Sequence, residues 1–240
     1  MLAILKKELN LFFVTPIGYL VIAMFLLING LFLWVFKGDY NVLNAGFADL
    51  NSFFFITPWF FIFMIPAITM RTFSDEIRLG TIEILKTKPI RSWDIVIGKY
   101  LGSLLLVFAA LIPTLSYVYT LVQLAATPEN IDFGSIIGSY IGLLFLASSF
   151  TAIGMFTSTL SNNQIVAFIA GVLVSFFMFY GFEALEEIIS LENFDTKKLG
   201  LHARFENIGR GVVDTKDLIY FMSVTFFFLF LTKSNFDLKQ

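Results

Sequence analysis

The residues that could do chemistry are concentrated in one polar stretch, residues 71–99 of the 240. This stretch holds six of the sixteen Lys and Arg residues and four acids, and long uncharged apolar runs lie on both sides of it. A polar segment between two hydrophobic spans must sit in water on one side of a membrane, where its charges can meet a partner. Its candidate interaction residues are Asp75, Glu76, Arg78, Gly80, Thr81 and Glu83.

Catalytic side chains are scarce elsewhere in the chain. There is no Cys, and His202 is the single His, which excludes a disulfide, a thiolate nucleophile and a histidine metal cluster. Gly98-Lys99 is followed by Tyr100 and lacks the preceding glycine of a phosphate-binding loop. We therefore predict that the chain is not an enzyme and that it binds no cofactor of its own.

The composition is typical of a membrane protein. Apolar residues make up 58% of the chain and charged residues 14%, against about 45–50% and about 25% in soluble domains. We predict an all-α polytopic membrane protein, a single domain over residues 1–240 with six transmembrane helices. The predicted spans are about 17–36, 52–70, 100–123, 135–159, 165–182 and 218–232.

Local signals predict where several helices begin and end. Residues 1–15 have an apolar helical face and are predicted to form an interfacial helix. That face consists of Leu2, Leu5, Leu9 and Phe12. Thr15-Pro16 favours an N-cap followed by proline at the first position of a new helix. The uncharged run 133–182 is too long for one span, and its polar cluster 161–164 predicts a turn.

The fourth and sixth spans have their own features. Gly134, Gly138 and Gly142 lie four residues apart, which favours a close helix–helix contact. The long polar loop before the last span begins with a short amphipathic helix around 183–189, and the rest of the loop shows no strong period. The last predicted span is short, because about 15 residues cover about 22 Å of an apolar core about 30 Å thick. Flanking residues or local thinning of the bilayer must supply the difference.

The distribution of basic residues predicts the orientation. Ten Lys and Arg residues lie on the side of the termini and of residues 71–99, and six lie on the other side, whose long loop is acidic overall. Basic residues near span ends favour the cytoplasm, so we predict that both termini and residues 71–99 are cytoplasmic. The predicted spans contain no charged residue and no His, which argues against an ion-coupled transporter. Any energy source must then be a partner.

The pattern within residues 71–99 predicts short helices with a proline corner. Gly80 interrupts the helical pattern and predicts a bend, and Pro89 predicts a stop. The predicted helix starts are Thr72 or Ser74, Thr81 and Ser92. The expected result is a compact knob that stands off the membrane, either as a docking surface or as a solvated connector between two spans.

Residues 73–89, continuing to Gly98-Lys99, closely resemble the loop of ABC-2-type transporter permeases. The shared pattern is an acidic pair, then Gly-Thr-x-Glu-x-Leu, a proline, and Gly-Lys at the start of the next span. The layout of interfacial helix, six spans and polar turn is also similar. The Phe-rich spans and residues 210–217 look most like the gliding-motility-associated ABC permeases of Bacteroidetes-type bacteria.

This resemblance implies the permease subunit of an ATP-driven exporter in the bacterial inner membrane. A coupling helix between the second and third spans would dock on a separate ABC ATPase subunit, which would bind ATP and Mg. The implied contact residues are Gly80, Thr81 and Glu83, braced by Asp75, Glu76 and Arg78. A second permease copy or a related permease subunit is implied as well, with the lipid bilayer around the spans. We expect no nucleic-acid partner.

Two other functions remain open on the sequence alone. A non-transporting membrane scaffold of a motility or secretion machine would use the same polar surface without depending on ATP turnover. A channel would conduct without ATP. The sequence does not identify the transported substrate.

Overall fold

The computed structural model describes residues 1–44, 49–86, 90–125, 131–189 and 196–238, and within these ranges the chain forms helices and no strand. The helices are α1 (Leu2–Val14), α2 (Pro16–Gly30), η1 (Leu31–Val35), α3 (Asn51–Thr69), α4 (Arg71–Arg78), α5 (Thr81–Lys86), α6 (Ser92–Leu111), η2 (Ile112–Thr114), α7 (Leu115–Leu124), α8 (Phe133–Leu160), α9 (Gln164–Phe176), η4 (Phe177–Gly181), α10 (Phe182–Ile189), η5 (Thr196–Leu199), α11 (Leu201–Gly209) and α12 (Thr215–Leu238). Six stretches are long and apolar enough to cross a membrane: Pro16–Val35, Asn51–Arg78, Ser92–Leu124, Phe133–Leu160, Gln164–Glu186 and Thr215–Leu238. The chain is an all-α polytopic membrane protein, as the composition predicts.

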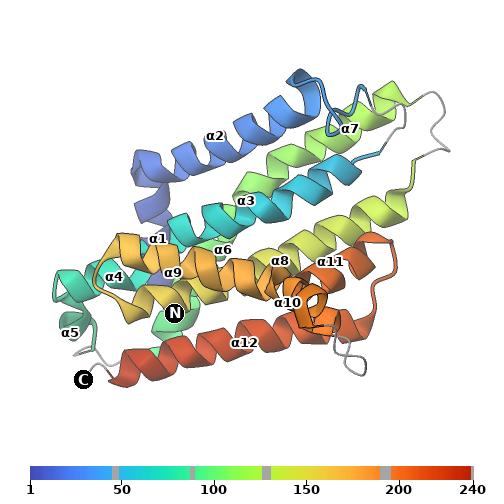
Figure 1. The fold of residues 1–240 in the computed structure, drawn as a ribbon. Coiled ribbons are helices and arrows are strands. Elements are labelled where there is room, and N and C mark those ends of the chain that lie inside the picture. Colours follow the sequence, from blue (N-terminus) through green and yellow to red (C-terminus); the bar gives the residue numbers. More distant parts are fainter. Residues whose placement is uncertain (45–48, 87–89, 126–130, 190–195, 239–240) are drawn as a thin grey trace.

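α8 is the central helix, and α3, α6, α9, α11 and α12 pack around it (Figure 1). Its 28 residues extend over about 42 Å. Residues 149–155 are all buried, so α8 is covered on every side at this level and not along one stripe. An apolar helix that is buried all round forms the core of a bundle.

Both chain termini lie at the same end of the bundle, which we call the terminal end (Figure 1). There the ring centroids of Phe73 in α4 and Phe236 in α12 are 5.8 Å apart. The Asn235 amide donates a hydrogen bond to Thr159 Oγ1 at 2.9 Å, which joins the end of α12 to the end of α8. α1, α4, α5 and the start of α6 also lie at the terminal end, whereas α10 and α11 lie toward the opposite, far end.

Two predicted helix starts are confirmed. α2 begins at Pro16 with Thr15 as its N-cap residue, although the Thr15 hydroxyl donates back to Leu11 O at 2.6 Å. The polar turn after α8 is also present. Its Asn163 side chain accepts a hydrogen bond from Ile165 N at 2.9 Å and so caps α9.

Several membrane helices extend beyond the predicted spans, and the second, third and last do so most. The second candidate span runs through Met70, whose backbone is helical, to the end of α4. The third begins at Ser92, before the predicted start. The last helix has 24 residues, and a length of about 36 Å crosses an apolar core of about 30 Å without local thinning.

α1 packs on α6 through one side of the helix. Ile4, Glu8 and Phe12 are buried, whereas Leu2 is 73% exposed. Their four-residue spacing places the three buried residues on one side of the helix. The apolar face expected to lie in the membrane interface shares only Phe12 with these three residues, and the sequence did not indicate that Glu8 is buried.

The far end contains α11, a helix that was not predicted from the sequence pattern. Leu201, Phe205 and Ile208 are buried, and α11 contacts α8. Arg204 Nη1 donates to Asp217 Oδ1 at 2.7 Å, which ties α11 to the start of α12. The prediction that this loop has no strong period was wrong, because the three buried residues follow helical spacing.

Two of the four-spaced glycines of α8 lie against α11. A Cβ atom on Gly138 would lie 2.4 Å from Ile208 O, and one on Gly142 would lie 2.9 Å from the Phe205 ring. A Cβ atom on Gly134 would meet only Asp132 Oδ1, at 3.2 Å. The close helix–helix contact is therefore between α8, at Gly138 and Gly142, and α11, the short helix at the far end.

Replacing Gly138 with Ala should destabilise the protein by about 1–3 kcal/mol, because the methyl group forces a backbone carbonyl away in a packed interior. Gly30→Ala is the matched control, since nothing lies within 4 Å of its added Cβ and alanine is the better helix former. Thermal unfolding of both variants in detergent measures the difference. Equal midpoints would contradict the close contact between α8 and α11.

Candidate functional site

The corner between α4 and α5 turns at Gly80, whose φ of +68° lies in the left-handed region that favours glycine. The predicted bend at this glycine is confirmed, and α5 begins at Thr81. Leu79 is 67% exposed although it is apolar, and Gly80, Thr81 and Glu83 are exposed beside it. We call these four residues the tip.

α4 itself is part of the bundle and does not belong to a knob that stands off the membrane. Phe73 is fully buried, and α4 contacts α8 and α9. The hydroxyls of Thr72 and Ser74 donate back to the carbonyl oxygens of Thr69 and Met70. Neither residue is an N-cap, because the helix continues from α3 and its first N–H groups already have helical partners.

The start of α6 also differs from the prediction. Ser92 is the first residue of the helix and Arg91 is its N-cap, without a side-chain capping bond. The amino group of Met1 lies 3.9 Å from Asp94 Oδ1, which brings the N-terminus to this point. Pro89, the predicted helix stop, lies outside the described residues.

Asp75 joins α4 to the polar turn before α9. Its carboxylate accepts a hydrogen bond from Arg78 at 3.0 Å and lies 3.7 Å from Arg71 Nε. Gln164, the first residue of α9, donates its amide to the same carboxylate. Asp75 therefore holds the end of α4 against the start of α9, and Arg78 binds the same carboxylate from within α4.

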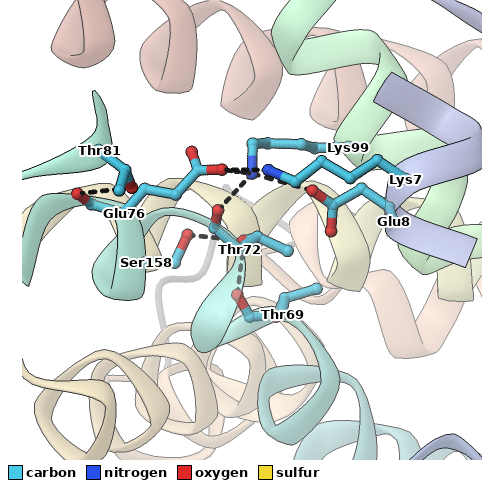
Figure 2. Close-up of polar contacts among 8 residues, drawn as sticks. All are labelled: Lys7, Glu8, Thr69, Thr72, Glu76, Thr81, Lys99 and Ser158. Atoms are coloured by element: carbon cyan, nitrogen blue, oxygen red, sulfur yellow. Dashed lines mark hydrogen bonds and ion pairs between the residues drawn. The ribbon is translucent and has the colours of Figure 1, made fainter. Parts of the chain in front are cut away.

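Glu76 reaches a buried lysine that three helices share (Figure 2). Lys99 of α6 is 1% exposed, and its Nζ lies 3.0 Å from Glu76 Oε1 and 3.0 Å from Glu8 Oε1 of α1. The same Nζ donates to Thr72 O at 2.7 Å. Lys7 Nζ lies 3.0 Å from Glu76 Oε1 and adds a second cation. We call the two lysines and two glutamates the ion cluster.

The partners of Lys99 account for its burial. Moving an unpaired ammonium out of water costs several kcal/mol. Its three N–H donors face three oxygens, one each from Glu8, Glu76 and Thr72. The Phe73 ring centroid, 5.1 Å from Nζ, adds a cation–π contact. Two lysines and two glutamates balance in charge, so the cluster places no net charge in the bundle.

Gly98 and Gly102 allow α1 to approach Lys99. A Cβ atom on Gly98 would lie 3.0 Å from Ile4 Cβ, and one on Gly102 would lie 2.6 Å from Glu8 Cβ. Small residues four apart on one face permit this close crossing. The segment 98–102 thus lets α1 and α6 pack closely through its two glycines, and its Lys99 provides the charge that pairs with Glu8.

Thr72 extends the connection to α8. Its hydroxyl lies 3.0 Å from Ser158 Oγ, while its carbonyl accepts from Lys99 (Figure 2). α1, α4, α6 and α8 therefore meet around one lysine. Lys99 and Asp217 lie outside the spans predicted from the sequence, but inside the longer candidate membrane helices Ser92–Leu124 and Thr215–Leu238.

The described residues contain no group of three or more His, Cys, Asp or Glu side chains that could hold a metal ion. Comparison with protein families matches residues 36–196 to the ABC-2 family transporter proteins. The matched segment is more than half of the chain and includes the tip, α4 and Lys99, but not Glu8. No curated protein matches the sequence.

Replacing Lys99 with Met should destabilise the protein by about 3–5 kcal/mol, because Glu8 is left buried without its cation. Lys6→Met is the control, since Lys6 is exposed on the same helix as Glu8 and surface changes shift stability by about 0.5 kcal/mol or less. The double variant Lys99→Met/Glu8→Met should regain part of the loss. Unfolding in detergent provides the measurement, and equal losses for Lys6→Met and Lys99→Met would contradict the buried ion cluster.

Proposed function

Because this chain belongs to the ABC-2 family of transporter proteins, we propose that it is the permease subunit of an exporter driven by a separate ATPase subunit. The family makes it a membrane component of an ABC transporter and implies an ABC ATPase as partner. The proposal assigns the ATPase contact to the tip, which consists of Leu79, Gly80, Thr81 and Glu83.

The contrast between the tip and its base carries this proposal. Leu79 is exposed although apolar, and Glu83 places a carboxylate near it on α5. An apolar side chain beside a charge suits a groove on a protein partner, with the apolar contact at the centre and the charged contact at the rim. The base of the tip, which is α4, is fixed, because Asp75 binds Gln164 of α9 and Glu76 binds Lys99 of α6.

The ion cluster offers a route from this contact into the membrane helices. Glu76 connects α4 to Lys99 of α6 and, through it, to Glu8 of α1, while Asp75 connects α4 to Gln164 of α9. A movement of the tip during ATP binding and hydrolysis would therefore tilt α1, α6 and α9 together. In this proposal ATP and Mg bind to the partner subunit and not to this chain.

The excess of basic residues at the terminal end supports a cytoplasmic location for the tip and both termini. We place the protein in the bacterial inner membrane, beside a second copy or a related permease subunit. The resemblance of the Phe-rich spans and of residues 210–217 supports a role in gliding motility. The alternative is a scaffold that holds such a machine together without transport.

Replacing Glu83 with Arg should release the ATPase subunit, because the substitution reverses a charge at the contact. Asp39→Arg is the matched control, an exposed carboxylate outside the terminal end. Pull-down of the purified protein in detergent should retain the ATPase with wild type and Asp39→Arg and lose it with Glu83→Arg. Retention of the partner and of its stimulated hydrolysis by Glu83→Arg would refute docking at the tip. The scaffold alternative would be favoured if the ATPase stayed bound and its rate of ATP hydrolysis were the same for every substitution at the tip.

The orientation predicts a labelling pattern that needs no background correction, because the chain has no Cys. A single cysteine in place of Thr81 should react with a membrane-impermeant maleimide only after the cells are opened. A cysteine in place of Asp39 should react in intact cells. The reverse pattern would place the tip outside the cytoplasm and exclude an ATPase contact there.

A further inference from the structure

A cleft of about 250 Å³ lies at the far end, away from the tip and the ion cluster. α3, α8, η4 and α11 line it. Its apolar wall consists of Phe54, Phe55, Pro58, Phe179 and Phe205. Most drug-sized sites enclose about 300–1,000 Å³, so this cleft suits one segment of a longer ligand.

The polarity of the cleft changes with depth. Asn51, the first residue of α3, lines it at the polar end, and Pro58 lies about 10 Å further along the helix axis. Because α3 is a candidate membrane span, we expect the deeper part of the cleft to be level with the apolar layer of the bilayer. A ligand with a polar head and an apolar chain matches this gradient.

Ser139 of α8 is a buried polar group without a partner in the cleft wall. It is 4% exposed and lines the cleft, and its hydroxyl forms no hydrogen bond with any described residue. The Ser139 hydroxyl is therefore available to a ligand oxygen.

The rim carries one charge of each sign at the end of α11. Glu206 lies in the last turn of the helix and Arg210 is its C-cap residue, and both side chains are exposed and line the cleft. Within the described part of the chain the Arg210 guanidinium has no ion pair, and Glu206 has only a 3.9 Å contact with His202 Nε2. His202 itself is held at 3.0 Å by Glu183.

We propose that this cleft binds a zwitterionic phospholipid from the surrounding bilayer. Arg210 binds the phosphate, for which a guanidinium is well suited. Glu206 binds the headgroup ammonium, Ser139 meets an ester oxygen, and an acyl segment lies on the aromatic wall. A purely anionic headgroup would face the Glu206 carboxylate, and an uncharged one would leave Arg210 unused.

Trp59 provides an internal reporter, because its ring centroid lies 5.6 Å from that of Phe179 in the cleft wall. Replacing Trp34 and Trp93 with Phe leaves Trp59 as the single fluorophore among the three tryptophans. Phospholipids brominated on the acyl chain, with phosphoethanolamine or phosphoglycerol headgroups, are titrated into this variant in detergent. We expect saturable quenching by both lipids. The midpoint for the phosphoethanolamine lipid should come at a mole fraction roughly fivefold lower than for the phosphoglycerol lipid, because one exposed ion pair changes affinity by about that factor.

The variants separate the two charges. Glu206→Gln should raise the midpoint for the phosphoethanolamine lipid to that of the phosphoglycerol lipid, and Arg210→Gln should weaken both. Lys216→Gln, an exposed cation at the same end but outside the cleft, should change neither. Glycerophosphoethanolamine without acyl chains should compete poorly. Non-saturable quenching that is equal for both lipids, or midpoints that Glu206→Gln and Arg210→Gln leave unchanged, would overturn the proposal and leave only nonspecific lipid contact.

Discussion

A buried lysine must find negative partners, and the terminal end of this bundle is arranged around that requirement. Lys99 meets Glu8 from a segment 91 residues away in the sequence, and it also meets Glu76 and a main-chain carbonyl of α4. The loss of either glutamate would leave unbalanced charge in a site that excludes water. The positions of α1 and α4 relative to α6 therefore depend on one ammonium group.

This constraint bears on how the proposed ATPase partner could move the membrane helices. The tip is short and exposed, but its base is tied to α6, α1 and α9 through charged and hydrogen-bonded side chains. Charge-assisted contacts have discrete geometries, so the base would transmit a displacement instead of absorbing it. At the far end Arg204 binds Asp217, and the cleft there shares no lining residue with the tip.

The sequence predicted the helical class, the six spans, the bend at Gly80 and the helix start at Pro16, because hydropathy and backbone preference act locally. It did not predict the burial of Lys99. A prediction from hydropathy places a lysine outside the span. Lys99 can be buried because Glu8, its partner, comes from α1, which is distant in the sequence. The N-cap interpretation of Thr72 failed for a related reason, since nothing local shows that the helix continues from the preceding span. α11 was missed although Leu201, Phe205 and Ile208 carried the signal, because the surrounding charges obscured it.

The central claim is that an ATPase subunit contacts the tip, and photo-crosslinking from Leu79 tests it most directly. A photoreactive phenylalanine analogue at position 79 would project from an exposed side chain, so it reports a neighbour without removing a buried contact. Irradiation of the intact membrane complex should join the chain to an ATPase subunit from position 79, and not from position 39. An intact complex that forms crosslinks from position 79 only to lipid or to the chain itself would contradict the account.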